Sequence, residues 1–590
     1  MGIAAAAIAC ASTMLVAQGW VEAHLALRFT LLFVEIGVGI PCWWAIATRR
    51  LAHTADRDRR GREAAPPATS PDADGMRRAA LAGAVFVAWA IVAAFASGHL
   101  AVAILGTWLD AVGGITVVAV VAAWALGVCA GTDGARVVTR ALEVAVVVNA
   151  VVAVIQVPVD LHGVGLGLLD HRSTGLWTNP VFLSAFLGAG VWLLAHRLQR
   201  DTRWGAAIVL VGAALQVAGG RLGLVVLVVA VAGAAVALTR RTALALLAFL
   251  ALGFAAGGAL GAVSGHATAN AAGRAGALLG TGTGAEGVVP RLETWTASLR
   301  AVAHDPIFGT GPALSQVATG PRRSLRLARA EGPDRSFAET HNLLLEYAVT
   351  TGVPGLLAFV VFAAIAFRLA GWRSPLAGFA CLALISHLFQ PNHAELTPLA
   401  FLALGAACAT RARYRVTPVT PVALGAVALA AGTTFTIGAW ALATSSSSVA
   451  AARHATTTAR SLLPWWSAPY ERTAQLDEAV ASANHDTASY RAALSNELEA
   501  ARREPYLPQP WARAGALELQ LGEVGAAETD LRRALADDPW SVASLRELSV
   551  ALAIDHRYKD ALDAVDRALS VAPSDADLLT RRAILSTHTA

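Results

Sequence analysis

Long apolar runs separated by short polar segments fill the first 441 residues of the chain. A helix needs about 20 apolar residues to cross the hydrocarbon core of a bilayer. Runs that approach this length predict spans at 3–20, 25–47, 79–97, 112–130, 141–157, 180–196, 205–219, 222–238, 243–263, 343–367, 375–389, 397–410 and 420–441. We therefore predict an all-α fold, in which the first domain, 1–441, is a polytopic membrane helical bundle of about 12–13 spans.

The pattern changes after residue 441. A linker-like run, Thr444–Ser448, leads into a polar, alanine-rich segment with helical periodicity. Alanine and proline recur there every 34 residues, as Ala493, Ala500 and Pro505, as Ala527, Ala534 and Pro539, and as Ala561, Ala568 and Pro573. This pattern resembles the tetratricopeptide repeat over about 485–585, and the alternative is a set of ordinary alanine-rich helices. We expect a second domain, 442–590, whose α-solenoid offers a surface to a protein partner.

Composition agrees with a membrane protein, because 56% of the residues are hydrophobic and only 15% are charged, against roughly 25% charged in soluble chains. The net charge of +5 does not predict a nucleic-acid partner, because most arginines lie in short loops between apolar runs. The cysteines lie in or beside apolar runs without the spacing of metal ligands, so we expect neither disulfides nor a metal site: Cys10, Cys42, Cys129, Cys381 and Cys408.

The arginines of the short loops predict the orientation, since basic residues accumulate on the cytoplasmic side. The 48–78 loop carries Arg49, Arg50, Arg57, Arg59, Arg60, Arg62, Arg77 and Arg78, so we place it in the cytoplasm. Alternation of the spans then puts the other basic groups on the same side: Arg136 and Arg140; Arg197, Arg200 and Arg203; Arg240 and Arg241; Arg368 and Arg373; Arg411, Arg413 and Arg415.

This orientation places the long segment 264–342 outside the cytoplasm. With an odd number of spans, the domain 442–590 is outside as well, and a miscount of one span moves it to the cytoplasm. The sequence thus predicts a multi-pass protein of the cytoplasmic (inner) membrane, with a large extracytoplasmic loop and an extracytoplasmic C-terminal domain.

Charged groups near membrane depth are costly and are therefore candidates for function. Arg221 stands in the sequence GGRLG, at the outer ends of two spans. A guanidinium keeps its charge and can bind phosphate in a bidentate manner, and the neighbouring glycines let a ligand approach the backbone. The alternative is an arginine that extends to the membrane interface.

The long loop becomes helical in the stretch PRLETWTASLRAVAHDPIFGTGP. Pro290 suits the first position of an amphipathic helix, which places Arg291 in a first turn where backbone N–H groups also attract anions. The helix should end near His304. Four arginines follow, and they suit either a polyanionic ligand or a solvated face: Arg322, Arg323, Arg326 and Arg329.

The loop closes with THNLLLEYAVTTGVPG. His341 and Asn342 lie at the outer entry of the next span, and Glu346 lies in its first or second turn. Gly352, Pro354 and Gly355 should break or kink that helix. A histidine here can act as a general base near neutral pH, and the alternative is an ordinary interfacial histidine.

The motifs PRLETW, HDPIFGTGP and HNLLLEYAVTTGVPG together resemble the O-antigen ligase family, within the group that includes O-antigen polymerases and bacterial protein O-oligosaccharyltransferases. The stretch RSTGLWTNPVFLSAFLG (172–188) is similar to an earlier motif of that family, with Asn179 and Pro180 matching. The resemblance covers about residues 80–410. It departs at Arg221, where Gly220 and Leu222 replace the usual flanking Ser and Gly.

The resemblance implies an inverting, metal-independent membrane glycosyltransferase with no cofactor. Its donor would be a glycan on undecaprenyl pyrophosphate, and its acceptor a hydroxyl of a glycan, lipid or protein. Arg221 and Arg291 would hold the pyrophosphate, and His341 would deprotonate or orient the acceptor. Asn342 and Glu346, beside His341, are further substrate-binding candidates. Three other readings stay open: a polysaccharide polymerase, a protein O-oligosaccharyltransferase, and a non-catalytic transporter or assembly scaffold of the cell envelope.

Overall fold

The computed structural model of the chain describes residues 1–13, 23–48, 71–107, 112–159, 161, 166–169, 171–177, 179–265, 288–333, 339–371, 373–390, 392–409, 414, 416, 419–443 and 448–589. Most of these residues form α-helices and short 3-10 turns, and an isolated β-bridge pairs Leu169 with Arg172. Several predicted features lie outside the described residues: 49–70 of the basic loop, 266–287 of the long loop, Arg411, Arg413, Arg415 and 444–447 of the linker.

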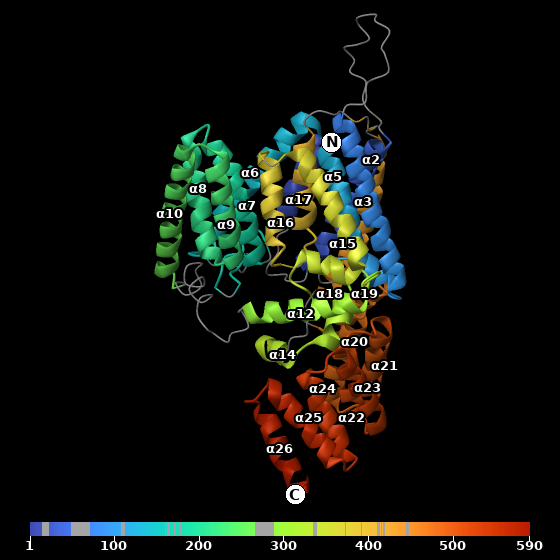
Figure 1. The fold of residues 1–590 in the computed structure, drawn as a ribbon. Coiled ribbons are helices and arrows are strands. Elements are labelled where there is room, and N and C mark those ends of the chain that lie inside the picture. Colours follow the sequence, from blue (N-terminus) through green and yellow to red (C-terminus); the bar gives the residue numbers. More distant parts are fainter. Residues whose placement is uncertain are drawn as a thin grey trace, which may run out of the picture. The chain divides into compact units, whose positions relative to one another are not determined.

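The helices group into two compact units (Figure 1). The first unit comprises residues 1–91, 109–280 and 354–436. The second unit comprises residues 92–108, 281–353 and 437–590, so it contains both the structured part of the long loop and the C-terminal helices.

The apolar helices are α1 (Gly2–Thr13), α2 (Ala23–Ala47), α3 (Pro71–Ala96), α5 (Gly114–Cys129), α6 (Gly131–Ile155), α7 (Pro180–Leu198), α8 (Gly205–Ala218), α9 (Arg221–Ala237), α10 (Arg240–Val263), α15 (Leu343–Ala370), α16 (Pro375–Ser386), α17 (Leu396–Cys408) and α18 (Val419–Ala443). Seven described helices are long and apolar enough to cross a membrane: α2, α3, α6, α7, α10, α15 and α18. The other six are shorter and coincide with the remaining predicted spans. The predicted all-α fold is therefore confirmed, and each predicted span corresponds to an apolar helix.

The boundaries of α3 and α6 differ from those of the corresponding predicted spans. Helix α3 already begins at Pro71 and helix α6 at Gly131, so Arg77, Arg78 and Arg140 lie on helices and not in loops. These three arginines thus stand in the N-terminal halves of α3 and α6. A long arginine side chain can reach water from such a position while its backbone stays helical.

Glycines allow the apolar helices of the first unit to pack closely. A Cβ on Gly127 of α5 would lie 2.3 Å from the carbonyl oxygen of Leu402, and one on Gly405 of α17 would lie 2.0 Å from that of Trp124. Both distances are too short for any side chain. Close backbone approach through small residues is a usual way for helices to associate in a membrane, where burial of apolar surface gives little drive.

The second unit contains α4 (Leu100–Leu105), α12 (Val288–His304), α13 (Ser315–Thr319), the 3-10 turn η6 (Gly320–Arg322), α14 (Leu325–Glu331) and the C-terminal helices. The latter are α19 (Val449–Leu462), α20 (Ala468–Asn484), α21 (Thr487–Arg503), α22 (Pro508–Gln520), α23 (Val524–Asp537), α24 (Val542–Ile554), α25 (Tyr558–Val571) and α26 (Ala576–Thr589). From α20 onwards each helix packs against the next one, which is the nearest-neighbour arrangement of a solenoid.

The repeat that the sequence predicts is confirmed at the level of packing. The recurring alanines lie on the second helix of successive pairs, and all are fully buried: Ala493, Ala500, Ala527, Ala534, Ala561 and Ala568. Gly515 of α22 faces Leu531 of α23, and a Cβ on it would lie 2.6 Å from the Leu531 side chain. Small residues therefore set the spacing within each pair. The structure adds α19 and α20 before the predicted start near 485.

Candidate functional site

Arg221 is the first residue of α9, directly after the turn that joins α8 to α9. Gly219 has a left-handed backbone (φ 63°), which lets the chain reverse within two residues. A Cβ on Gly220 would lie 1.9 Å from Oγ of Ser184 on α7, and one on Gly223 would lie 2.5 Å from Cβ of Ser184. The glycines around Arg221 therefore serve close helix packing, and they fix the guanidinium to the start of α9 beside α7.

The 172–188 motif forms the approach to α7 in the same unit. Asn179 is the N-cap of α7, its side chain accepts a hydrogen bond from the backbone N–H of Val181 (2.8 Å), and Pro180 takes the first helical position. Gln156, the C-cap of α6, accepts hydrogen bonds from the backbone N–H groups of Thr174 (3.0 Å) and Gly175 (2.9 Å). Asn179 and Pro180 therefore start α7, and Gln156 holds the preceding part of the motif against the end of α6.

In the second unit, two loop motifs fit together at the kink of α15. Gly352 has φ 69° and ψ 178°, which interrupts the helix and leaves carbonyl groups of the preceding turn without helical partners. Val349 and Thr350 instead accept hydrogen bonds from Thr310 N–H (3.0 Å) and Gly311 N–H (2.8 Å). Val353 N–H donates to the carbonyl of Pro306 (2.8 Å). The predicted kink is confirmed, and it is the docking point of the HDPIFGTGP segment.

His341 precedes α15 in a left-handed conformation (φ 51°), which a non-glycine residue adopts only when its surroundings hold it there. Two neighbours supply that constraint. Asn342 accepts the backbone N–H groups of Leu344 (3.0 Å) and Leu345 (3.1 Å) and so caps α15. Glu346 is buried, and its carboxylate accepts hydrogen bonds from the Thr340 hydroxyl (2.9 Å) and the Thr340 backbone N–H (3.3 Å). The segment with His341 is thus fastened on both sides.

Arg291 lies in the first turn of α12 and acts on His341 through its charge. Burial and, to a lesser extent, the positive charge of the Arg291 guanidinium lower the pKa of His341 to about 4. The imidazole is therefore neutral near pH 7, and one ring nitrogen carries a lone pair that can accept a proton. The structure brings these two predicted site residues together within the second unit. Arg221 belongs to the first unit.

The basic cluster after α13 contains one buried arginine, Arg323, while Arg322 is half-buried and Arg326 and Arg329 are exposed. Arg322 donates to the carbonyl of Ala318 (2.7 Å), Arg326 to Glu293 (3.3 Å), and Arg329 to the carbonyl of Ser570. Arg323 is buried between Asp538 (2.9 Å) and Glu331 (3.2 Å). The predicted solvated face therefore fits Arg326 and Arg329, whereas Arg323 departs from the prediction because it is buried in ion pairs.

The Arg323–Asp538 pair joins the long loop to the repeat helices. Around it, Ala328 of α14 belongs to the same apolar core as Leu531, Leu545 and Val565, and Leu325 packs against that core. On the other side of the loop, Ser324 donates to Glu293 of α12 (2.8 Å). A continuous set of contacts therefore runs from the repeats through 323–328 to α12, the helix that carries Arg291.

A buried polar cluster in the first unit was not predicted from the sequence. Arg28 of α2 donates from Nε to Glu395 (2.6 Å), and Nδ1 of His393 lies 2.7 Å from the other carboxylate oxygen. The His393 ring lies 3.9 Å, centroid to centroid, from that of Phe182. Arg28 interrupts an apolar run, and this signal could have identified it. A buried ion pair with a histidine neighbour fastens α2 to the start of α17.

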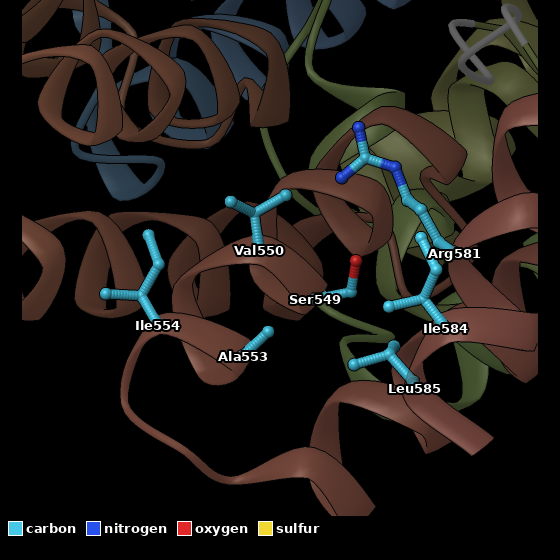
Figure 2. Close-up of a pocket in the computed structure, with 7 residues that line it drawn as sticks. All are labelled: Ser549, Val550, Ala553, Ile554, Arg581, Ile584 and Leu585. Atoms are coloured by element: carbon cyan, nitrogen blue, oxygen red, sulfur yellow. The ribbon is translucent and has the colours of Figure 1, made fainter. Parts of the chain in front are cut away.

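The repeat helices also form an apolar hollow between α24 and α26 (Figure 2). It has a volume of about 330 Å³ and is lined by Ser549, Val550, Ala553, Ile554, Arg581, Ile584 and Leu585. None of these side chains is a carboxylate, thiol or imidazole, so the hollow offers no acid or base for catalysis. Its character suits an apolar contact with another protein.

Comparisons with known proteins bear on both parts of the chain. Residues 206–360 match the family model described as O-antigen ligase. This segment includes Arg221, Arg291 and His341. No curated protein matches the chain.

Solved structures with a likeness to the chain include a thermophilic TPR protein of Thermus thermophilus. It shows 22% identity and a TM-score of 0.23, and the match covers 29% of this chain and 90% of that one. The APC/C hetero-tetramer Cut9–Hcn1 shows 10% identity and a TM-score of 0.24 over 79% of this chain and 76% of that one. At these TM-scores the description of the fold rests on the helices themselves. Residues 206–360 are thus similar to the O-antigen ligase family, in a chain whose described helices include seven that are long and apolar enough to cross a membrane and whose C-terminal helices are tetratricopeptide-like.

Proposed function

We propose that this chain transfers a glycan from undecaprenyl pyrophosphate to an acceptor hydroxyl on the outer face of the cytoplasmic membrane. The observation that carries the proposal is a neutral, half-buried His341 under the influence of the Arg291 charge, within the segment that matches the O-antigen ligase family. A base and a fixed cation side by side suit a reaction that removes a proton from an alcohol and releases a diphosphate.

The chemistry follows from these groups. The acceptor oxygen attacks the anomeric carbon while its proton moves to the neutral imidazole of His341. The bond between the anomeric carbon and the diphosphate oxygen breaks on the opposite face, so the configuration inverts. Arg291 stabilises the negative charge of the departing undecaprenyl pyrophosphate. Two guanidinium groups can balance this charge, and no step requires a metal ion.

Arg221 contributes to donor binding in this proposal. Its support is the position at the start of α9, inside the family match, where both a guanidinium and the first N–H groups of a helix are offered to an anion. Asn342 and Glu346 are proposed as positioning residues for His341, because their observed contacts cap α15 and fasten Thr340.

The C-terminal helices would support the loop and recruit a partner. Support for the first role comes from the Arg323–Asp538 pair and the apolar core shared with α14. Support for the second is the apolar hollow between α24 and α26. A protein acceptor could use the same surface, so the transfer assay should offer glycan, lipid and protein acceptors in parallel.

The test is transfer by the purified full-length chain in liposomes that contain the lipid-linked donor. We expect His341→Ala to lower the rate by about 10²–10⁴-fold, the usual contribution of a general base. His304→Ala is the matched control, since His304 is an exposed histidine of the same loop. A His341→Ala protein with a near wild-type rate refutes the base assignment.

Donor binding is tested separately from transfer. Arg291→Ala and Arg221→Ala should each weaken binding about 10–100-fold, because a hydrogen bond to a charged group contributes roughly 1.5–3 kcal/mol. Arg300→Ala, on the exposed side of α12, should leave binding unchanged. Intact donor binding in Arg291→Ala and Arg221→Ala would contradict the proposed diphosphate site.

A further inference from the structure

A second basic site lies in the first unit, away from Arg221. It is a pocket of about 280 Å³ at the C-terminal end of α7, where the N-terminal half of α6 and the start of α16 meet it. The lining residues are Arg136, Thr139, Arg140, Glu143, Leu193, His196, Arg197, Arg200 and Pro375.

This pocket is separate from the candidate donor site. The turn before Arg221 contacts α7 at Ser184, near the start of that helix. The pocket uses Leu193, His196 and Arg197, near its end. At 1.5 Å per residue, Ser184 and Arg197 are about 20 Å apart along α7. The two arginine-containing sites therefore serve opposite ends of the same helix.

The charge of the pocket is not balanced within the protein. Arg197 forms a bidentate pair with the buried Glu143, with Nε–Oε1 2.7 Å and Nη2–Oε2 2.9 Å. Arg136 pairs with the exposed Asp133 (3.0 Å). In the part of the chain that the structure describes, no ion pair involves Arg140 or Arg200. The guanidinium groups of Arg140 and Arg200 can therefore bind an anion, while the Arg197 side chain is held in place by Glu143.

An apolar stripe on α6 continues from the pocket. Val137, Val144, Val151 and Ile155 are 38–56% exposed and recur at helical spacing along one face. Arg140 stands between the first two of them, four residues before Val144. In a membrane such a stripe meets acyl chains, so an anion bound at Arg140 would be carried on a lipid whose chains lie along α6.

The side of the membrane follows from the same arginines. Arg136, Arg140, Arg197 and Arg200 are among the basic residues that the sequence assigns to the cytoplasmic face. Anionic phospholipids of that leaflet are attracted to basic residues at the membrane surface. A guanidinium binds phosphate through two parallel hydrogen bonds.

We propose that this pocket binds the phosphate headgroup of an anionic phospholipid of the cytoplasmic leaflet, with the acyl chains lying on the Val137–Ile155 face of α6. The lipid would hold α6, α7 and α16 together at the end of the bundle that is remote from Arg221. This inference is independent of the proposed glycan transfer, because it concerns other residues and a different ligand.

The experiment measures lipid binding and heat stability of the full-length chain in neutral detergent. Phosphatidylglycerol is titrated into the wild type and into the double variant Arg140→Gln/Arg200→Gln, and bound lipid is counted by native mass spectrometry. We expect the wild type to retain the lipid and to gain in unfolding temperature. The double variant should bind it at least tenfold more weakly and gain nothing.

Matched controls distinguish lipid binding at this pocket from a general attraction of anionic lipid to basic residues. Arg240→Gln/Arg241→Gln removes two exposed arginines of the same predicted face outside the pocket, and it should bind like the wild type. An equal loss in this control refutes a defined site. Equal binding of phosphatidylcholine refutes the role of charge, and equal stabilisation by glycerol phosphate means that the pocket takes a free phosphate and not a lipid. Arg197 is left unchanged, because its loss would strand the buried Glu143.

Discussion

His341 combines two unusual features for one residue, a left-handed backbone and a half-buried imidazole that is neutral at pH 7. Its usual pKa would leave an exposed histidine partly charged just below pH 7. Burial first, and Arg291 second, lower this value to about 4. The side chain is consequently ready to accept a proton across the whole neutral range. The same low pKa makes the imidazole a weak base, so Arg291 keeps His341 unprotonated and able to accept a hydrogen bond from an acceptor hydroxyl without strengthening it as a base.

The pKa of His341 can be measured directly by NMR with labelled histidine, using His341→Gln to assign the signal. We expect the imidazole to titrate near pH 4. Since the positive charge of Arg291 disfavours the protonated form, Arg291→Gln should raise the pKa, but not to the usual value, because burial remains. Transfer should then lose activity only below about pH 5, with most His341 still neutral at pH 5. A midpoint at 6.5 in the wild type would contradict the buried environment.

The lowered pKa of His341 also determines how the stability of the folded protein changes with pH. A folded pKa below the unfolded one means that the folded state resists protonation of His341. This residue therefore costs stability as the pH falls from 6.5 towards 4, and the cost is constant below 4. His341→Gln should reduce the loss of stability of the second unit in this window.

Gly352 is the residue on which the docking of the HDPIFGTGP segment depends. Its φ of 69° and ψ of 178° are accessible almost only to glycine, and a Cβ there would lie 2.0 Å from the carbonyl oxygen of Ile307. We expect Gly352→Ala to cost more than the roughly 1–3 kcal/mol of backbone strain alone, measured as a lower unfolding temperature and a smaller folded fraction.

Gly332 provides the matched control for Gly352. It has a similar backbone, with φ 95° and ψ 169°, but a Cβ there would meet no atom within 4 Å. Gly332→Ala should therefore show the strain without the clash. Equal effects of the two substitutions would mean that the contact with Ile307 contributes nothing.

At the scale of elements, the long loop and the repeat helices share an interior. Helix α14 contributes Ala328 to the core of α23, α24 and α25, and Arg323 places a buried charge opposite Asp538. Burial raises the pKa of Asp538, while the nearby Arg323 opposes that shift. Loss of one member of such a pair leaves the other charge buried and unpaired. The repeats therefore act on the loop through defined contacts.

A double-mutant cycle tests this coupling. Arg323→Met should destabilise the second unit by about 3–5 kcal/mol, because it leaves Asp538 buried and unpaired. Asp538→Leu should cost less, since Arg323 keeps Glu331 as a partner, and the double variant should recover part of the loss of Arg323→Met, with only Glu331 left unpaired. Proteolysis of the 288–333 segment should follow the same order, and the transfer rate should fall with it. Arg326→Ala, which breaks an exposed contact to Glu293, is the control and should change little. Strictly additive effects would exclude the coupling.

At the scale of the whole molecule, packing within the second unit constrains the side of the membrane on which its segments can lie. A bilayer cannot pass between two segments that share a packed core. Because α14 of the long loop packs with α25, the loop and the C-terminal helices must lie on the same side of the membrane. The sequence alone reaches this conclusion only if thirteen spans are counted correctly.

Cysteine labelling on intact spheroplasts measures the side. After replacement of the five native cysteines, Arg300→Cys in α12 and Ser586→Cys in α26 should both react with a membrane-impermeant maleimide. Arg240→Cys, on the predicted cytoplasmic face, should react only after permeabilisation. Labelling of residue 300 without residue 586 would contradict a shared side.

Much of this architecture was predictable because it depends on periodicity. Apolar runs predicted each apolar helix, the 34-residue recurrence predicted buried alanines such as Ala527 and Ala561, and glycine with proline predicted the kink at Gly352. The motif resemblance agrees with the match of residues 206–360 to the O-antigen ligase family model. These features are local, or they repeat along the chain.

Tertiary structure alone decided which distant residues meet. No sequence pattern predicts that Arg323 pairs with Asp538, 215 positions away, or Arg28 with Glu395, 367 positions away. A charged residue in the sequence does not indicate which residue it will contact in the fold. The same holds for the burial that lowers the pKa of His341 and for the pocket around Arg140 and Arg200. By itself the sequence determined helices, repeats and the candidate residues, since these follow from composition and spacing. Packing determined which candidates are buried, paired or open to a ligand, since desolvation and Coulomb energy depend on distances that only the folded chain has.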